Sequence, residues 1–194
     1  MEVPIILASA SPRRIELLQL IVPIFDVFPA NVDESIEIGL TQVQVAEYLA
    51  AKKARFVAEK FPESLIIGAD TIVCPGKTAK SKSILGKPTD YNHAVKMLKL
   101  LSGNTHRVIT GVCLARLEKI LTFHETTFVT FREISDAEIA DYVNSGEPFD
   151  KAGGYGIQGG ASKFASKIDG DITNVVGLPV ARFRSEMKAF CQLA

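Results

Sequence analysis

The segment Leu7–Leu18 joins the end of an apolar run to a polar turn and a helix start. Residues 3–7 are apolar and include β-branched side chains, which predicts a short buried strand. After the turn, apolar residues recur at roughly helical spacing up to Ile21, and Ser11 followed by Pro12 is typical of a helix start. Because the free N–H groups of such a start attract anions, the segment predicts an anion site.

Arg13 and Arg14 lie in the first turn of this predicted helix, where the helix dipole disfavours positive charge. Their planar guanidinium groups suit phosphate oxygens. Two interpretations fit the segment equally: the arginines meet a bound phosphate group, or they are solvated residues beside an ordinary helix cap.

The bulk properties limit the classes of function. A chain of 194 residues fits one domain, or one domain with two lobes. Lys plus Arg equals Asp plus Glu at 22 each, so we expect no nucleic-acid partner and only local phosphate affinity. The three cysteines are widely spaced and form no Cys-x-x-Cys pair, which favours a reducing compartment. We expect no signal peptide, no membrane span and a cytoplasmic location.

The hydrophobic pattern predicts an α/β fold, with a mixed, twisted sheet flanked by helices and a cleft where loops converge. Strands are expected at 25–29, 65–73, 107–116 and 120–131, the last two as an antiparallel pair. Helices are expected at 41–60 with Thr41 as cap, 90–101 with Thr89 as cap, from the capping box at Ser135 to about 145, and after Pro179 to about Cys191. Residues 74–85 are expected to form an exposed turn, and residues 160–174 an irregular segment.

Asp70 places a charge inside the apolar run 65–73. Aspartate is rarely buried without a partner, so this residue is either part of a site or a salt-bridged aspartate near a strand end.

The segment 146–160 is the second irregularity, because five of its last eight residues are glycine. It is either a mobile linker or a loop that approaches a ligand closely, and its Lys151, Tyr155 and Gln158 argue against a plain linker.

Five short motifs occur in order between residues 5 and 180: Ser-Ala-Ser-Pro-Arg-Arg, Ala-Asp-Thr, Gly-Lys-Pro, Asp-Lys-Ala-Gly-Gly-Tyr-Gly-Ile-Gln-Gly and Val-Val-Gly-Leu-Pro. This ordered set resembles the Maf family of nucleoside triphosphate pyrophosphatases, and its Tyr-Gly-Ile-Gln-Gly resembles the dTTP/UTP branch. The resemblance implies one Maf-like domain over 1–194, with two lobes around a central cleft, in a homodimer. It also implies hydrolysis between the α- and β-phosphates, giving the monophosphate and pyrophosphate, with Mg²⁺ or Mn²⁺.

The resemblance implies that cationic side chains hold the triphosphate. They are Arg13, Arg14, Lys53 and Lys87, with Ser9 in the same phosphate-binding segment. A lone lysine such as Lys53 on a helix is by default a solvated residue, and only the resemblance gives it this role. The triphosphate brings close to four negative charges, so several cations are needed to hold it and to stabilise departing pyrophosphate.

The resemblance also implies roles for the acidic residues and for the base. Asp70 is expected to be the general base or to orient a metal-bound water. Glu34 is expected to bind the metal with Asp70, although its neighbour Asp33 could do so instead. Base choice is expected to depend on Thr71, Gln158 and Arg13, because a carboxamide can pair with one carbonyl and one N–H of uracil or thymine.

Several alternatives stay open at this stage. Tyr155 either stacks on the base or packs against its loop. Lys77, Lys80 and Lys82 either extend the phosphate site or form a solvated tip, and the second is expected. A nucleotide-binding regulator of cell division and septum formation, or a pyrophosphatase of 7-methyl-GTP, are the alternative functions.

Overall fold

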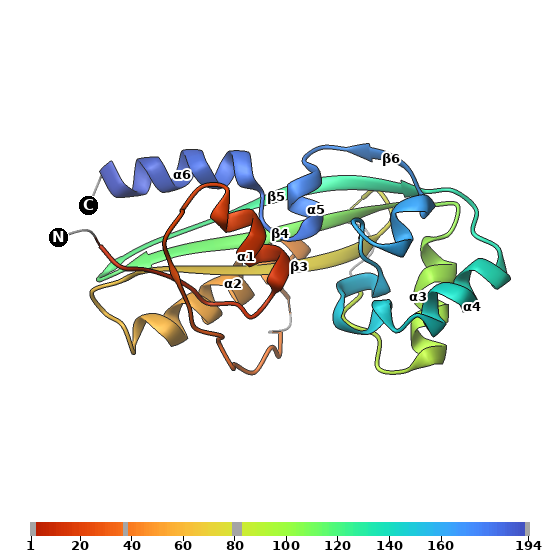
Figure 1. The fold of residues 1–194 in the computed structure, drawn as a ribbon, viewed down its shortest axis with the longest axis horizontal. Helices are drawn as coiled ribbons and strands as arrows, with labels where there is room; N and C mark the ends of the chain where they lie inside the picture. The colour runs from red at the N-terminus through yellow and green to blue at the C-terminus, as the bar shows by residue number, and fades with distance from the viewer. Residues whose placement is uncertain (1–2, 37–38, 79–82, 193–194) are drawn as a thin grey trace. The chain divides into compact units, whose positions relative to one another are not determined.

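The computed structural model describes residues 3–36, 39–78 and 83–192, and the chain divides into two compact units (Figure 1). Unit 1 comprises Met1–Asp70, Thr110–Glu125 and Gly177–Ala194, and unit 2 comprises Thr71–Ile109 and Thr126–Val176. Each unit has a buried apolar cluster of its own. The division agrees with the expectation of two lobes, while the cleft stays a prediction.

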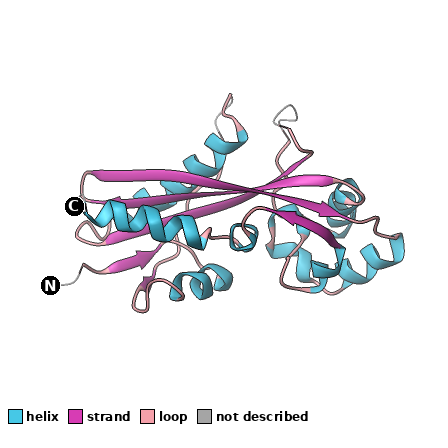
Figure 2. Cartoon of the chain, turned by 90° about the horizontal axis from the view of Figure 1, so that it is seen from above, coloured by secondary structure: helices cyan, strands magenta, loops and turns pink. Residues whose placement is uncertain are grey.

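One six-stranded sheet has the order β2-β1-β3-β4-β5-β6. Its strands are β1 Ile5–Leu7, β2 Asp26–Val27, β3 Leu65–Pro75, β4 Thr105–Arg116, β5 Lys119–Phe131 and β6 Ala165–Asp169. The sheet is mixed, because β1 pairs in parallel with β2 and β3 whereas β5 pairs antiparallel with β6 (Figure 2). Only two residues connect the neighbours β4 and β5, as in an antiparallel hairpin. The predicted α/β class is therefore confirmed.

The helices are α1 Pro12–Gln19, α2 Gln42–Ala58, α3 Tyr91–Leu101, α4 Asp136–Asn144, α5 Ile172–Val176 and α6 Val180–Gln192. Three short 3₁₀ turns, Glu147–Asp150, Ala152–Gly154 and Gly160–Phe164, lie in or next to the glycine-rich segment. Among the described residues, no helix combines the length and the apolar character that a membrane crossing needs.

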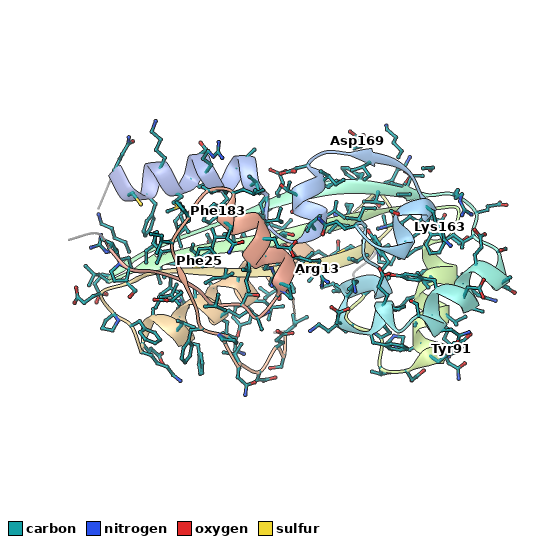
Figure 3. The ribbon with its side chains drawn as sticks, in the orientation of Figure 1. Arg13, Phe25, Tyr91, Lys163, Asp169 and Phe183 are labelled. Carbon is teal, nitrogen blue, oxygen red and sulfur yellow. The ribbon has the colours of Figure 1, made fainter. Side chains whose placement is uncertain are left out.

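In unit 1, α2 and α6 lie on opposite faces of the sheet (Figure 1). Helix α2 approaches β3 so closely that a Cβ on Gly68 would overlap the carbonyl oxygen of Ala50. On the other face, Phe183 of α6 is fully buried (Figure 3). The two helices cover the part of the sheet that includes β3, the strand that carries Asp70.

In unit 2, the core is rich in aromatic rings. Phe131 makes edge-to-face contacts with His106, Tyr155 and Phe164, and Tyr142 makes another with Phe164. Such contacts connect β4, β5 and α4 to the glycine-rich segment, so that segment is packed and is not a free linker.

The helix caps test the local predictions. Ser11, Thr41 and Ser135 each accept a backbone N–H at a helix start, as predicted. The capping box predicted at Ser135 is confirmed, and Thr41 forms a second one with Gln44 that was not predicted. The prediction that Thr89 caps a helix was wrong, because Asp90 accepts the N–H of His93 and α3 begins at Tyr91. The segment 160–174 was also expected to be irregular, but it contains β6 and α5.

Candidate active site

The turn between β1 and α1 fixes Arg14. Ser11 accepts the backbone N–H of Arg14 at 3.4 Å, and the Arg14 side chain donates from Nη1 to Ser9 Oγ at 3.2 Å. Its Nε donates to the carbonyl oxygen of Gly177 at 2.9 Å, so the Val-Val-Gly-Leu-Pro motif holds this arginine. Arg14 is therefore a positioned residue, and Arg13 lies beside it, half-buried, at the start of α1 (Figure 3).

Lys53 of α2 joins the two acidic residues that were predicted for the site. Its Nζ lies 2.5 Å from Asp70 Oδ1 and 2.7 Å from Glu34 Oε1. The side chains of Lys53 and Asp70 are 11% and 10% exposed, whereas that of Glu34 is 56% exposed. A solvated Lys53 is thus excluded, because its ammonium group is buried between two carboxylates.

Asp70 is buried within β3, and its pKa is raised from its ordinary value. Burial is the largest cause, because it disfavours the charged form. The positive charges of Lys53 and Arg14 act in the opposite direction, and the negative charge of Glu34 adds to the rise. Burial also lowers the pKa of the Arg14 guanidinium, and the negative charges of Asp70 and Glu34 act in the opposite direction.

Glu34 and its neighbour Asp33 make different contacts. Asp33 accepts the N–H of Ser35 at 3.0 Å and its hydroxyl at 2.5 Å, and these hydrogen bonds lower its pKa. Glu34 instead reaches Lys53. Within the described residues, Glu34 is therefore the second carboxylate that contacts the lysine of Asp70.

The donor set fits one kind of metal site. Among the described residues, no group of three or more His, Cys, Asp or Glu side chains is arranged to hold a metal ion. Two carboxylates do converge on one cation, Lys53. Mg²⁺ commonly uses one or two carboxylates and completes its shell with phosphate oxygens and water. Glu34 and Asp70 therefore fit a metal that arrives with a phosphate ligand.

The remaining predicted residues belong to unit 2. Thr71 follows Asp70 directly in β3 and is half-buried, while the side chains of Lys87 and Gln158 are exposed. The N–H of Gly153 donates to the carbonyl oxygens of Leu85 and Gly86, at 3.2 and 3.0 Å. Within unit 2, the Gly-Lys-Pro motif thus contacts the start of the glycine-rich segment.

Tyr155 packs in the core of unit 2. It is 6% exposed, and its hydroxyl shares a hydrogen bond of 2.7 Å with Nε2 of the fully buried His106. The ring also contacts Phe131 edge-to-face. Of the two interpretations of Tyr155, packing is confirmed. Lys80 and Lys82 lie outside the described residues, and Lys77 is exposed.

Three residues, one in unit 1 and two in unit 2, had no predicted role. The carbonyl oxygen of Gly177 accepts a hydrogen bond from Arg14. The Val-Val-Gly-Leu-Pro motif that contains Gly177 was part of the family resemblance, but no role was predicted for it. Tyr142 and Glu147 hydrogen-bond to the glycine-rich segment. The density of glycines was the one signal that could have suggested such close neighbours.

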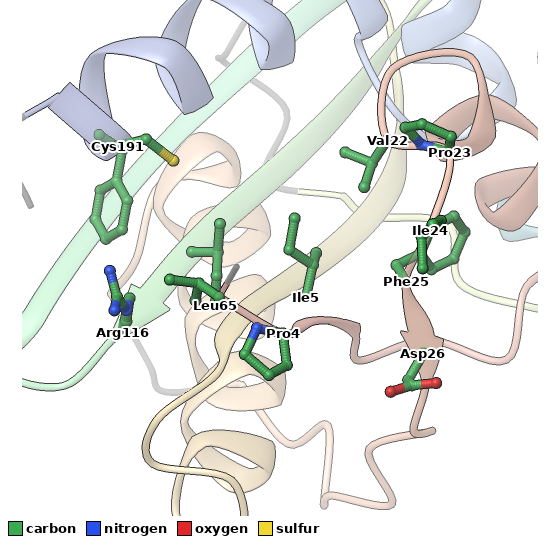
Figure 4. A pocket seen from close by; sticks show the side chains of 12 residues that line it. Pro4, Ile5, Val22, Pro23, Ile24, Phe25, Asp26, Leu65, Arg116 and Cys191 are labelled. Carbon is green, nitrogen blue, oxygen red and sulfur yellow. The ribbon is translucent and has the colours of Figure 1, made fainter. Parts of the chain in front are cut away.

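Unit 1 also contains a cavity of about 760 Å³ (Figure 4). Its wall is mostly apolar and includes Pro4, Ile24, Phe25 and Leu65, with Asp26 and Arg116 as charged residues. No predicted site residue lines it. The residues that line the cavity therefore do not include Lys53, Glu34 or Asp70.

Comparisons with known proteins show what the chain is similar to. The model of the family described as Maf-like protein matches residues 4–190. The chain belongs to the Maf-like protein family. Among curated Maf-like relatives, a dTTP/UTP pyrophosphatase of Koribacter versatilis is 50% identical over 95% of this chain and 93% of the relative. One of Bacillus cereus is 50% identical over 96% of this chain and 95% of the relative. A solved structure of the Staphylococcus aureus Ham1 protein has a TM-score of 0.42 and 17% identity, covering 66% of this chain and 71% of that chain.

Proposed function

We propose that this Maf-like protein is a dTTP/UTP pyrophosphatase that releases pyrophosphate and the nucleoside monophosphate. Two relatives with that name are each 50% identical to nearly the whole chain. The main support for the proposal is that Lys53 forms ion pairs with both Asp70 and Glu34. The positive charge of Arg14 also interacts with both carboxylates. We include in it one functional domain over 1–194, a homodimer and a cytoplasmic location.

Asp70 is proposed as the general base. Its carboxylate takes a proton from the water that attacks the α-phosphorus, the bond to the bridging oxygen breaks, and pyrophosphate leaves. A carboxyl group with a raised pKa is a better base near neutral pH than an ordinary one. Lys53 holds Asp70 and Glu34 together through its two short contacts, as well as adding positive charge toward the phosphates.

Arg13, Arg14 and Lys87 are proposed to bind the phosphates, with Ser9 fixing Arg14. One pair of unit charges about 4 Å apart contributes on the order of 4 kcal/mol near a protein surface, so a few such contacts offset the charge of a departing pyrophosphate. Glu34 and Asp70 would hold Mg²⁺ or Mn²⁺. When bound, that metal supplies charge stabilisation to phosphate oxygens.

Gln158, with Thr71 and Arg13, is proposed to select the base. A carboxamide can accept the N3–H of uracil or thymine and donate to a carbonyl oxygen. A base that leaves these groups unpaired is rejected, because desolvated polar groups without partners are costly.

The test is a product assay with pure protein, Mg²⁺ or Mn²⁺, and a panel of dTTP, UTP, CTP and 7-methyl-GTP. We expect UMP and pyrophosphate from UTP, and a Gln158→Ala variant should lose preference between UTP and CTP more than it loses turnover. Orthophosphate and a diphosphate as products contradict the cleavage position. Binding without turnover supports the regulator, and a preference for 7-methyl-GTP contradicts the substrate class.

A further inference from the structure

The turn Gly156–Gly160 carries the exposed Gln158 and is held at both ends by side chains that precede it in the chain. The N–H of Gly156 donates to the hydroxyl oxygen of Tyr142 at 3.1 Å. The N–H of Gly160 donates to Oε2 of Glu147 at 2.9 Å. The proposed base-reading side chain therefore lies between two anchored backbone groups.

The two anchors are bonded to each other. The Tyr142 hydroxyl donates to Oε1 of Glu147 at 3.0 Å, so a continuous set of hydrogen bonds runs from one end of the turn to the other. Burial raises the pKa of Tyr142, and its phenol thus keeps the proton that it donates. Lys151 donates to the Glu147 carbonyl oxygen at 2.7 Å and fixes the backbone that carries the carboxylate.

The glycines of the turn lie against this pair. A Cβ on Gly159 would overlap the Glu147 carboxylate. A Cβ on Gly160 would lie 3.2 Å from Glu147 Oε2 and 3.3 Å from the Tyr142 ring. Side chains at these positions would push the carboxylate away, so contact with Glu147 is a reason for glycine here, apart from any approach of a ligand.

We propose that Glu147 and Tyr142 are positioning residues that hold Gln158 in the orientation in which it selects the base. This inference rests on the proposed function. A side chain that is already oriented does not lose additional conformational freedom when the nucleotide binds. Loss of the anchors therefore weakens binding of the preferred base and reduces the preference for it over other bases. Proton transfer at Asp70 in unit 1 is unaffected.

The test uses Glu147→Gln, which keeps the shape of the side chain but replaces one acceptor oxygen by an NH₂ group. The oxygen that remains can accept from the Tyr142 hydroxyl or from the Gly160 N–H, so one of the two hydrogen bonds is lost. The control is Asp141→Asn, an exposed residue of α4 with the same change of charge. Values of kcat and KM are measured for UTP and CTP with full-length protein.

In Glu147→Gln we expect the UTP preference over CTP to fall about tenfold through KM, the factor that one lost charge-assisted hydrogen bond supplies. The kcat for UTP and the Asp141→Asn values stay close to wild type. Tyr142→Phe shifts the preference in the same direction. An unchanged preference in both folded variants, or a loss confined to kcat, overturns the inference.

Amide hydrogen exchange in the free protein separates this inference from the proposed function. We expect faster exchange at Gly156 in Tyr142→Phe, faster exchange at Gly160 in Glu147→Gln, because a carboxamide oxygen is a weaker acceptor than a carboxylate, and no change in the control. If the wild-type protein does not hydrolyse UTP, the proposed function fails and the exchange rates still decide whether the two residues anchor the turn. Unchanged exchange shows that they do not.

Discussion

His106 provides a quantitative test of the unit 2 core, because it is a fully buried histidine. Burial lowers its pKa from 6.5 to about 4, since the charged ring is disfavoured away from water. Its Nε2 bonds to the Tyr155 hydroxyl, and Nδ1 has no hydrogen-bond partner among the described residues. The folded protein thus contains the neutral ring under conditions in which the unfolded chain takes up a proton.

The sign of the effect follows from this difference. The folded pKa lies below the unfolded one, so the contribution of His106 to stability is complete above pH 6.5 and is lost as the pH falls toward about 4. At 1.36 kcal/mol for each pKa unit, the loss across this window is about 3 kcal/mol. That is a large part of the 5–15 kcal/mol that is typical, roughly, for a folded protein.

The assay compares urea unfolding of the wild-type protein with that of His106→Gln between pH 7.5 and pH 4. The variant is less stable at neutral pH, and we expect the difference in unfolding free energy to shrink by about 3 kcal/mol at the acid end. Tyr155→Phe is the control, because it removes the hydroxyl but keeps the buried ring and so keeps the wild-type pH dependence. A difference that is constant with pH, or an NMR titration of His106 near pH 6.5, refutes the reasoning.

Two further predictions concern packing and a helix cap. Gly111→Ala should destabilise the protein by about 1–3 kcal/mol, because a Cβ there overlaps the backbone of Ala46 in α2. Gly86→Ala is the control, because a Cβ at that position meets no neighbour within 4 Å and should change the urea midpoint little. Glu138 has a pKa lowered to about 2 by its hydrogen bond to Arg132, so its contribution is present above the unfolded pKa of 4.5 and is lost as the pH falls toward 2. The stability difference between wild type and Glu138→Gln should therefore decrease over this range in thermal unfolding, and an equal difference at pH 6 and pH 2 contradicts the assignment.

The features that the sequence predicted well are those set by local chemistry. Ser11, Thr41 and Ser135 cap helices because a hydroxyl oxygen can accept an N–H two or three residues later, whatever the rest of the chain does. The prediction of a cap at Thr89 was wrong because the next residue, Asp90, is also a good cap and accepts the N–H of His93. Local rules thus identified the helix start to within one residue.

Other features depend on contacts that no local pattern encodes. The strand β6 contains mostly exposed residues and forms because β5 offers it an edge to pair with. The roles of Tyr142 and Glu147 follow from hydrogen bonds to backbone N–H groups 14 and 13 residues later. Every residue except proline has such an N–H group, so no side-chain pattern marks these partners. The cluster of Lys53, Glu34 and Asp70 was expected only through the family resemblance, because three distant segments supply it.

The central claim is that Asp70 performs proton transfer within a cluster that binds a triphosphate. It is tested most directly by Asp70→Asn, with UTP turnover measured across pH and UTP binding measured by calorimetry on the same samples. We predict that the variant binds UTP but loses nearly all release of pyrophosphate. We also predict that the wild-type rate falls on the acid side at a higher pH than the ordinary pKa of an aspartate gives. Wild-type turnover in Asp70→Asn, with the same acid limb, would contradict the account.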